Sequence, residues 1–213
     1  DENSSTYSVF RTEENLGDIQ LNVPGEHNVL NSLAAVVLGL EMGLSFQLIQ
    51  KGISTYQGLR RRFAIKGIHN DITVVYDYAH HPTEVEATLQ AAKAGWDRRI
   101  VAVFQPHLFT RTQAFFREFA KTLQIADVVV ITDIYPAREQ PIPGVTAKLI
   151  YVECQRSMGD QCFHIPDLDD LEKILDEIVK PNDLIITMGA GSIWRYSESY
   201  TNHLAFLADG VKS

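Results

Sequence analysis

The sequence predicts an α/β fold with a Rossmann-like, mostly parallel sheet and flanking helices, preceded by a remnant of a second α/β domain. From Ile65 onward, short β-branched runs alternate with longer segments of helical periodicity. Polar side chains cluster where these runs end. Strands that alternate with helices of this length are joined by right-handed crossovers, so we expect most of them to be parallel.

The first 24 residues predict an antiparallel hairpin. Apolar and polar residues alternate in YSVFR and in IQLNV, and Asn15–Asp18 lies between the two runs as the expected turn. A helix is expected from Asn28 to Met42, with an apolar face formed by Leu30, Leu33, Ala34, Val37, Leu38 and Leu40.

A shorter helix is expected from Ser45 to near Gly52. The hairpin and two helices are too few to build a good core, so we interpret residues 1–60 as part of a truncated domain. The polar and basic segment Tyr56–Arg62 is the expected hinge to a second domain, residues 61–213.

The second domain reads as a regular series of strands and helices. The expected strands are 72–77, 99–104, 127–133, 162–165 and 183–188. The expected helices are 84–94, 111–124, 147–157, 168–179 and 192–207. Thr83 with Glu86, and Thr110 with Gln113, match the capping box that starts a helix.

Composition excludes several classes of function. The chain has 213 residues, a net charge of −8 and no Lys/Arg-rich run, which argues against nucleic-acid binding. Two cysteines predict neither a disulfide framework nor a zinc site and suit a reducing cytoplasm. No apolar run is long enough to span a bilayer, and we expect a cytoplasmic protein. Because the chain begins at Asp1 rather than Met, we expect a fragment of a longer protein.

The candidate site lies where the strands end. The residues concerned are Asp77, Tyr78, His80 and His81 after the first strand, Gln105, His107 and Arg111 after the second, Asp133, Tyr135, Arg138 and Glu139 after the third, and Gly189–Ser192 after the fifth. The carboxyl ends of parallel strands meet at one edge of a sheet, and ligands of open α/β sheets bind there.

Each group also has a plainer interpretation. Asp77 can cap a turn. Adjacent His80 and His81 usually point apart and lack a Glu-x-x-His or Cys-x-x-Cys partner, so we predict no metal site and expect one imidazole to be structural. Arg111 in the first turn of a helix offers a planar fork for a carboxylate or phosphate.

The segment GAGS, residues 189–192, is either an anion cradle or a tight turn. It is not a complete G-x-G-x-x-G, and no G-x-x-x-x-G-K-[ST] occurs, so neither a redox dinucleotide nor a phosphate loop is predicted.

Taken together, the blocks GEHNVLNSLAA, GLRRRF, YDYAHHPTE, VFQPHLFTRT, TDIYPAREQPIPGV and MGAGSI resemble the Mur ligases over essentially the whole chain. Within that family the chain is most similar to the branch that adds alanine, with the tripeptide-recycling ligase as the nearer alternative. A nucleotide-binding module without catalysis is a further alternative for the isolated chain.

The resemblance implies a three-domain enzyme that uses ATP and Mg²⁺ to activate the lactyl carboxylate of UDP-N-acetylmuramate as an acyl phosphate, which the amine of L-alanine attacks. Residues 1–60 correspond to the last part of the central ATP-binding domain and 61–213 to the C-terminal domain. The N-terminal domain, the rest of the central domain and the main magnesium ligands are missing partners, so the isolated chain is expected to be inactive.

The resemblance also implies roles for single residues. His27 and Asn28 correspond to the contacts with adenine, Arg62 to the arginine that reaches the ATP phosphates, and Asp77 to the acid that binds the ribose. Tyr78, His80, His107 and Arg111 correspond to the group that places the alanine, and we expect the last three to act in catalysis. Relatives often carry Arg at the position of Leu108, so its carboxylate-binding role is absent here or moved to Arg111.

Overall fold

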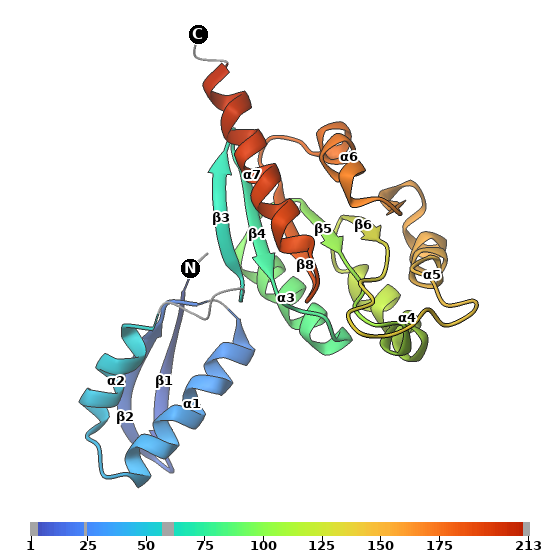
Figure 1. Cartoon of the computed structure of the whole chain (residues 1–213). Coiled ribbons are helices and arrows are strands. Elements are labelled where there is room, and N and C mark those ends of the chain that lie inside the picture. Colours follow the sequence, from blue (N-terminus) through green and yellow to red (C-terminus); the bar gives the residue numbers. More distant parts are fainter. Residues whose placement is uncertain (1–3, 24, 57–61, 211–213) are drawn as a thin grey trace. The chain divides into compact units, whose positions relative to one another are not determined.

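The computed structural model describes residues 4–23, 25–56 and 62–210, and for His27 it describes the backbone alone. The chain divides into two compact units (Figure 1), one of residues 1–60 with 90–97 and one of residues 61–89 with 98–213. The expected hinge falls almost wholly on residues 57–61, which lie outside the described residues. In the part of the chain that is described, no helix is long and apolar enough to cross a membrane.

The first unit contains the predicted hairpin and two helices. Strands β1 (Ser5–Arg11) and β2 (Glu14–Leu21) are antiparallel, and α1 (Glu26–Glu41) and α2 (Phe46–Ser54) follow. The predicted turn at Asn15–Asp18 is wrong. The chain reverses at Thr12, which has a positive φ of 55°, and Asp18 pairs with Ser8 inside the ladder. A bulge between Val9 and Phe10 absorbs the extra residue, which sequence alternation alone does not reveal.

The predicted apolar face of α1 is largely wrong. The helix buries Ser32, Val36 and Gly39, whereas Leu30, Val37 and Leu38 are 61–63% exposed. Apolar residues surround most of this helix, so their period could not select the side that packs on the hairpin. The core of the unit consists of Val9, Ile19, Leu21, Val23, Val36, Phe46, Ile49 and Ile53.

The second unit contains a six-stranded sheet that confirms the predicted fold class. In the sheet the strands follow the order β3-β4-β8-β5-β6-β7, and every pair except β3–β4 is parallel. The strands are β3 (Ala64–His69), β4 (Ile72–Asp77), β5 (Ile100–Phe104), β6 (Val128–Thr132), β7 (Cys162–Ile165) and β8 (Leu184–Met188). All five predicted strands are present within one residue of their expected ends.

Strand β3 was not predicted. It forms a tight hairpin with β4 through Asn70 and Asp71, which both have positive φ angles, of 51° and 61°. A two-residue turn of this kind requires positive φ at both positions and favours Asn and Asp. The Asn-Asp pair was therefore the available signal, but the Gly67 bulge breaks the alternation that would have marked the strand.

Five helices cover the two faces of this sheet. They are α3 (Pro82–Gly95), α4 (Phe109–Leu123), α5 (Lys148–Met158), α6 (Leu171–Ile178) and α7 (Ile193–Gly210). Right-handed crossovers from β4 through β7 place α3, α4 and α5 on one face, and the return to β8 places α6 and α7 on the other. The core under α6 and α7 includes Val74, Tyr76, Val103, Leu175 and Tyr200.

This strand order creates a switch point at β8. The helix that follows β8 lies on the opposite face from the helices that follow its neighbours β4 and β5. In open α/β sheets the crevice beyond the carboxyl ends of such strands is the usual ligand site. The loops after β4, β5 and β8 therefore border the expected ligand crevice.

Candidate functional site

Asp77 stabilises the loop after β4 through hydrogen bonds to backbone amides. It is the last residue of β4 and only 4% exposed. Its Oδ2 accepts the N–H of Phe63 at 2.6 Å and its Oδ1 accepts the N–H of Ala79 at 2.7 Å. Burial raises the pKa of Asp77, although these amides, Arg62 and Thr88 oppose the rise. The carboxylate therefore caps the turn, and a carboxylate has further lone pairs with which to accept a ligand hydroxyl.

Glu84 organises the start of α3. Its Oε2 accepts the backbone N–H groups of His80 at 3.0 Å and His81 at 3.2 Å, and the helix begins at Pro82. The expected capping box of Thr83 with Glu86 is wrong, because the reciprocal acid is Glu84 and the Thr83 hydroxyl bonds to the His81 ring at 2.9 Å. Proline at the first helical position shifts the box by two residues.

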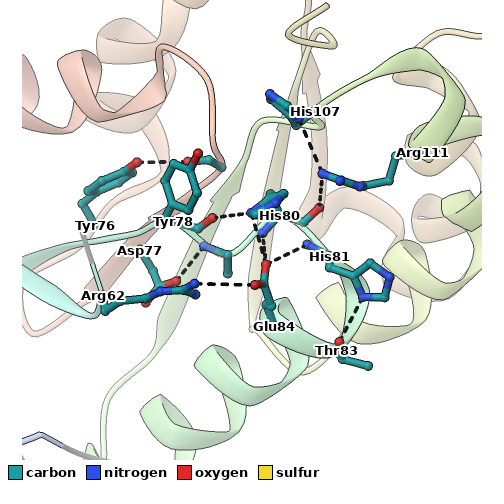
Figure 2. Close-up of polar contacts among 12 residues, drawn as sticks. Arg62, Tyr76, Asp77, Tyr78, His80, His81, Thr83, Glu84, His107 and Arg111 are labelled. Carbon is teal, nitrogen blue, oxygen red and sulfur yellow. Dashed lines mark hydrogen bonds and ion pairs between the residues drawn. The ribbon is translucent and has the colours of Figure 1, made fainter. Parts of the chain in front are cut away.

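The two adjacent histidines have different roles. His81 packs edge-on against Phe115 with ring centroids 5.0 Å apart. His80 lies between Tyr78 and His107, at centroid distances of 5.1 and 5.8 Å (Figure 2). Of the pair, His80 faces the other candidate residues and His81 is structural.

Arg62 joins the same cluster from the segment before β3. Its guanidinium lies 3.6 Å from Glu84 Oε1 and 6.0 Å from the centroid of the Tyr78 ring. Its side chain is 46% exposed, which leaves donors available to a ligand.

Beyond the ends of their strands, the loops after β5 and β6 are joined by backbone hydrogen bonds. Tyr135 donates its N–H to Pro106 O at 2.8 Å, and Leu108 donates its N–H to Tyr135 O at 3.0 Å. This pairing stacks the Tyr135 ring on His107, with centroids 5.8 Å apart and planes 15° apart. Leu108 ends the pairing at a positive φ of 72° and precedes α4.

Arg111 connects the β4 and β5 loops. Its Nη1 lies 3.4 Å from His80 O and 3.5 Å from His107 Nδ1. Burial lowers the pKa of His107, and Arg111 and His80 lower it further, against a smaller opposite effect of Glu139. His107 is therefore favoured in its neutral form. Because a guanidinium only donates, Nδ1 of His107 accepts and the ring proton resides on Nε2.

The N-terminus of α4 already carries a carboxylate. Glu139 accepts from the Thr110 N–H at 3.0 Å and from the Thr110 hydroxyl, and these bonds lower the pKa of Glu139. The expected capping box of Thr110 with Gln113 is therefore wrong, since the partner comes from the β6–α5 loop. An anion at this helix end would share it with Glu139.

The loop after β8 is a tight turn rather than an anion cradle. The Gln105 side chain fills it, accepting the Ile193 N–H at 3.1 Å and donating to Ser192 Oγ at 3.2 Å. A Cβ on Gly191 would lie 2.4 Å from Gln105 Oε1 and 2.5 Å from Tyr135 Cγ. The first amide of α7 is thus already bonded within the chain.

The structure brings together Arg62, Asp77, Tyr78, His80, His107 and Arg111, all in the second unit. Asn28 lies in the first unit near the start of α1, as does His27, whose side chain is outside the described residues. Among the residues that the structure describes, no group of three His, Cys, Asp or Glu side chains can hold a metal ion.

Sequence reasoning gave no role to Glu84 and left Gln105, Tyr135 and Glu139 as unassigned residues after strands. For Glu84 a signal was present, because Glu follows Pro82 at the third helical position. Gln105, Tyr135 and Glu139 each contact a segment that follows a different strand, and no local sequence pattern marks such contacts.

Comparison with known proteins decides the family. Residues 61–191 match the family described as Mur ligase, glutamate ligase domain. The chain belongs to the Mur ligase family.

Relatives of this Mur ligase chain are considerably longer. It is 49% identical over 203 residues to a UDP-N-acetylmuramate--L-alanine ligase of Salinibacter ruber, covering 94% of this chain and 42% of that protein. The corresponding ligase of Geotalea uraniireducens is 47% identical over 189 residues, covering 89% of this chain and 41% of that protein. This Mur ligase chain thus spans about two fifths of the length of the curated relatives it matches.

A solved structure supports the same family assignment. The crystal structure of UDP-N-acetylmuramate-alanine ligase MurC from Thermotoga maritima matches with a TM-score of 0.81 and 30% identity, covering 96% of this chain and 44% of that one. The murein peptide ligase mpl of Psychrobacter arcticus, at 24% identity and a TM-score of 0.65, shares the fold.

Proposed function

We propose that this chain is the amino-acid-placing part of an ATP-dependent ligase that joins L-alanine to UDP-N-acetylmuramate, a step of peptidoglycan precursor synthesis in the cytoplasm. The observation that carries the proposal is the paired hydrogen-bonding character of His80 and His107 beside Arg111. The names of its relatives, at 44–49% identity, support the same assignment.

The site offers donors on one side and an acceptor on the other. His107 presents Nε2–H next to the Arg111 guanidinium, so both groups donate. His80 Nδ1 lies 2.8 Å from the Tyr78 carbonyl oxygen, which only accepts. This contact favours the ring proton on Nδ1, which leaves Nε2 as an acceptor when the ring is neutral. An amino acid has the complementary pair, a carboxylate that accepts and an ammonium that donates.

This arrangement supports a direct chemical role. Arg111 and His107 hold the alanine carboxylate, and His80 Nε2 takes a proton from the alanine ammonium, leaving the electron pair on the amine nitrogen. The amine then attacks the acyl phosphate carbonyl and the C–N bond forms. Phosphate leaves with the electrons of the C–O bond and carries away the second amine proton, which leaves a neutral amide. Proton transfer by a positioned imidazole of this kind is a common source of rate enhancement.

For ATP, we assign Arg62 to the phosphates, Asp77 to the ribose, and His27 with Asn28 to the adenine. Mg²⁺ would neutralise phosphate charge during phosphoryl transfer. We assign the main Mg²⁺ ligands to the remainder of the longer protein.

We further propose that residues 1–60 are the end of the central ATP-binding domain, that 61–213 are the C-terminal domain, and that Tyr56–Arg62 is the hinge between them. A chain with this content lacks a phosphate loop. It is therefore expected to be inactive alone.

The test is Arg111→Lys in the longer protein, with Arg117→Lys on the same helix as the matched control. Lysine keeps the charge and loses the planar fork. A charged hydrogen bond contributes roughly 1.5–3 kcal/mol, so we expect KM for alanine to rise about 10- to 100-fold while KM for ATP changes little. The chain alone, in the same assay, gives the background rate.

Three outcomes contradict the proposal. A rise in KM for ATP alone would make Arg111 a phosphate ligand. Ligation of a peptide in place of alanine by the wild type would assign the recycling activity. Phosphate release by the isolated chain would show that no further domain is needed.

A further inference from the structure

Glu84 contacts Arg62 with one carboxylate oxygen, and His80 and His81 with the other (Figure 2). Its Oε2 accepts the His80 and His81 amides and lies 3.1 Å from His80 Nδ1. Its Oε1 lies 3.6 Å from the Arg62 guanidinium. A single carboxylate thus contacts the residue assigned to the alanine amine and the residue assigned to the ATP phosphates.

Glu84 is held in its charged form. Partial burial would raise the pKa of Glu84, but the His80 amide, the charges of His80 and Arg62 and the His81 amide together lower it below its usual value. A charged carboxylate beside Nδ1 stabilises a proton on that nitrogen.

The state of His80 follows from this environment. Two acceptors, the Tyr78 carbonyl and the Glu84 carboxylate, lie within 3.1 Å of Nδ1. Nδ1 therefore carries the proton, and Nε2 of the neutral ring keeps its lone pair. Within the described part of the chain, Nε2 has no hydrogen-bond partner, so it is available to a ligand.

We propose that Glu84 is a positioning residue for the ligase reaction: it fixes His80 as an Nδ1–H tautomer with Nε2 as the acceptor, and it holds Arg62 in the same arrangement. This inference rests on the proposed function for its meaning in catalysis. Its structural part, the tautomer of His80, is independent of any substrate. In other enzymes, a carboxylate likewise orients a catalytic imidazole by binding the ring nitrogen that does not react.

A purely structural role makes a different prediction. As a helix cap, Glu84 needs only an oxygen that accepts the His80 and His81 amides, and the Gln amide oxygen can accept both. As a positioning residue, it needs the negative charge beside Nδ1 and Arg62, which Gln cannot supply. Glu84→Gln therefore separates the two roles. Glu86→Gln is the matched control, because Glu86 is exposed on the same helix two residues further along.

The first experiment measures the His80 tautomer in the 213-residue chain, using ¹⁵N-labelled histidine and long-range ¹H–¹⁵N correlations. We expect the Nδ1–H pattern in the wild type, a mixture with the Nε2–H form in Glu84→Gln, and the wild-type pattern in Glu86→Gln. A wild type with its proton on Nε2, or a Glu84→Gln spectrum identical to the wild type, overturns the inference.

The second experiment places the same substitutions in the longer protein and measures ligation of alanine. Orienting partners of metal-bound imidazoles typically matter about 10- to 100-fold, and we expect an effect of similar size here. In Glu84→Gln, kcat/KM for alanine should fall by about that factor, with a smaller rise in KM for ATP. Glu84→Asp keeps the charge with a shorter reach and should recover part of the activity. Thermal midpoints equal to the wild type within a few degrees show that the variants are folded.

The outcomes separate this inference from the proposed function. If the wild-type longer protein does not ligate alanine, the proposed function fails, and the tautomer measurement still decides the structural claim. If the wild type ligates alanine and Glu84→Gln matches it in kcat/KM, Glu84 is a helix cap and the inference is wrong.

Discussion

The loops after β4 and β8 start side by side, since Asp77 at the end of one strand pairs with Met188 at the end of the other. They differ in what fills them. The β8 loop is packed by Gln105 and Tyr135, and its first helical amide is already bonded. The β4 loop directs Tyr78, His80 and, through Glu84, Arg62 toward one another and leaves an imidazole nitrogen available. A place at the ligand edge is therefore not enough; a loop must also keep unsatisfied groups.

The strongest test of this contrast is Gly191→Ala. A Cβ there would lie 2.4 Å from Gln105 Oε1 and 2.5–2.7 Å from two Tyr135 atoms, so the neighbours must move. Overpacking of this kind typically lowers the free energy of unfolding by about 1–3 kcal/mol. We expect a loss of about that size in the free energy of unfolding, measured by denaturant titration. Gly52→Ala, where the Cβ meets nothing within 4 Å, is the control and should not destabilise. If Gly191→Ala has the same free energy of unfolding as the wild type, the β8 loop is open rather than filled.

A second test removes the polar filling. Gln105→Leu keeps the volume but deprives the Ile193 amide of its acceptor and Ser192 of its donor. An unsatisfied buried group costs about 1–3 kcal/mol, and we expect that loss, read as a thermal midpoint lower by about 2–4 °C per kcal/mol. Gln113→Leu on the exposed side of α4 should change stability by less than about 0.5 kcal/mol. Equal effects of the two substitutions would contradict a special role for Gln105.

The smallest expected effect is a change in how the free energy of unfolding depends on pH. It distinguishes two carboxylates of the β4 loop, Asp77 and Glu84. The pKa of Asp77 is raised by burial, so its contribution to stability is fully present below about pH 3.8 and is lost as the pH rises through the folded-state pKa. The pKa of Glu84 is lowered, so its contribution is present above about pH 4.5 and is lost as the pH falls through the folded-state pKa.

The measurement is the free energy of unfolding between about pH 3 and about pH 7 for the wild type, Asp77→Asn and Glu84→Gln. The difference between wild type and Asp77→Asn should shrink as the pH rises, whereas the difference between wild type and Glu84→Gln should grow. Parallel curves for the two variants would show that both carboxylates have the same environment.

Strand and helix positions in the second unit were predictable because they depend on local pattern. Runs such as Ile72–Asp77 and Leu184–Met188 are buried on both faces of a parallel sheet, and such strands are nearly continuous apolar runs in sequence. Where the pattern was weak or uniform, prediction failed. The bulged strand β3 was missed, the hairpin turn was placed near Asn15 rather than Thr12, and the packed face of α1 was misassigned.

The sequence by itself determined the fold class, the family and the convergence of Tyr78, His80, His107 and Arg111, because strand order along the chain and residue type are local information. Tertiary structure alone decided which groups remain available to a ligand. Glu139 reaches the N-terminus of α4 from another loop, Gln105 fills the β8 loop across two strands, and the Tyr78 carbonyl and Glu84 set the proton position on His80. Hydrogen-bond satisfaction depends on distances of about 3 Å between atoms that can be far apart in sequence, and no periodicity encodes such distances.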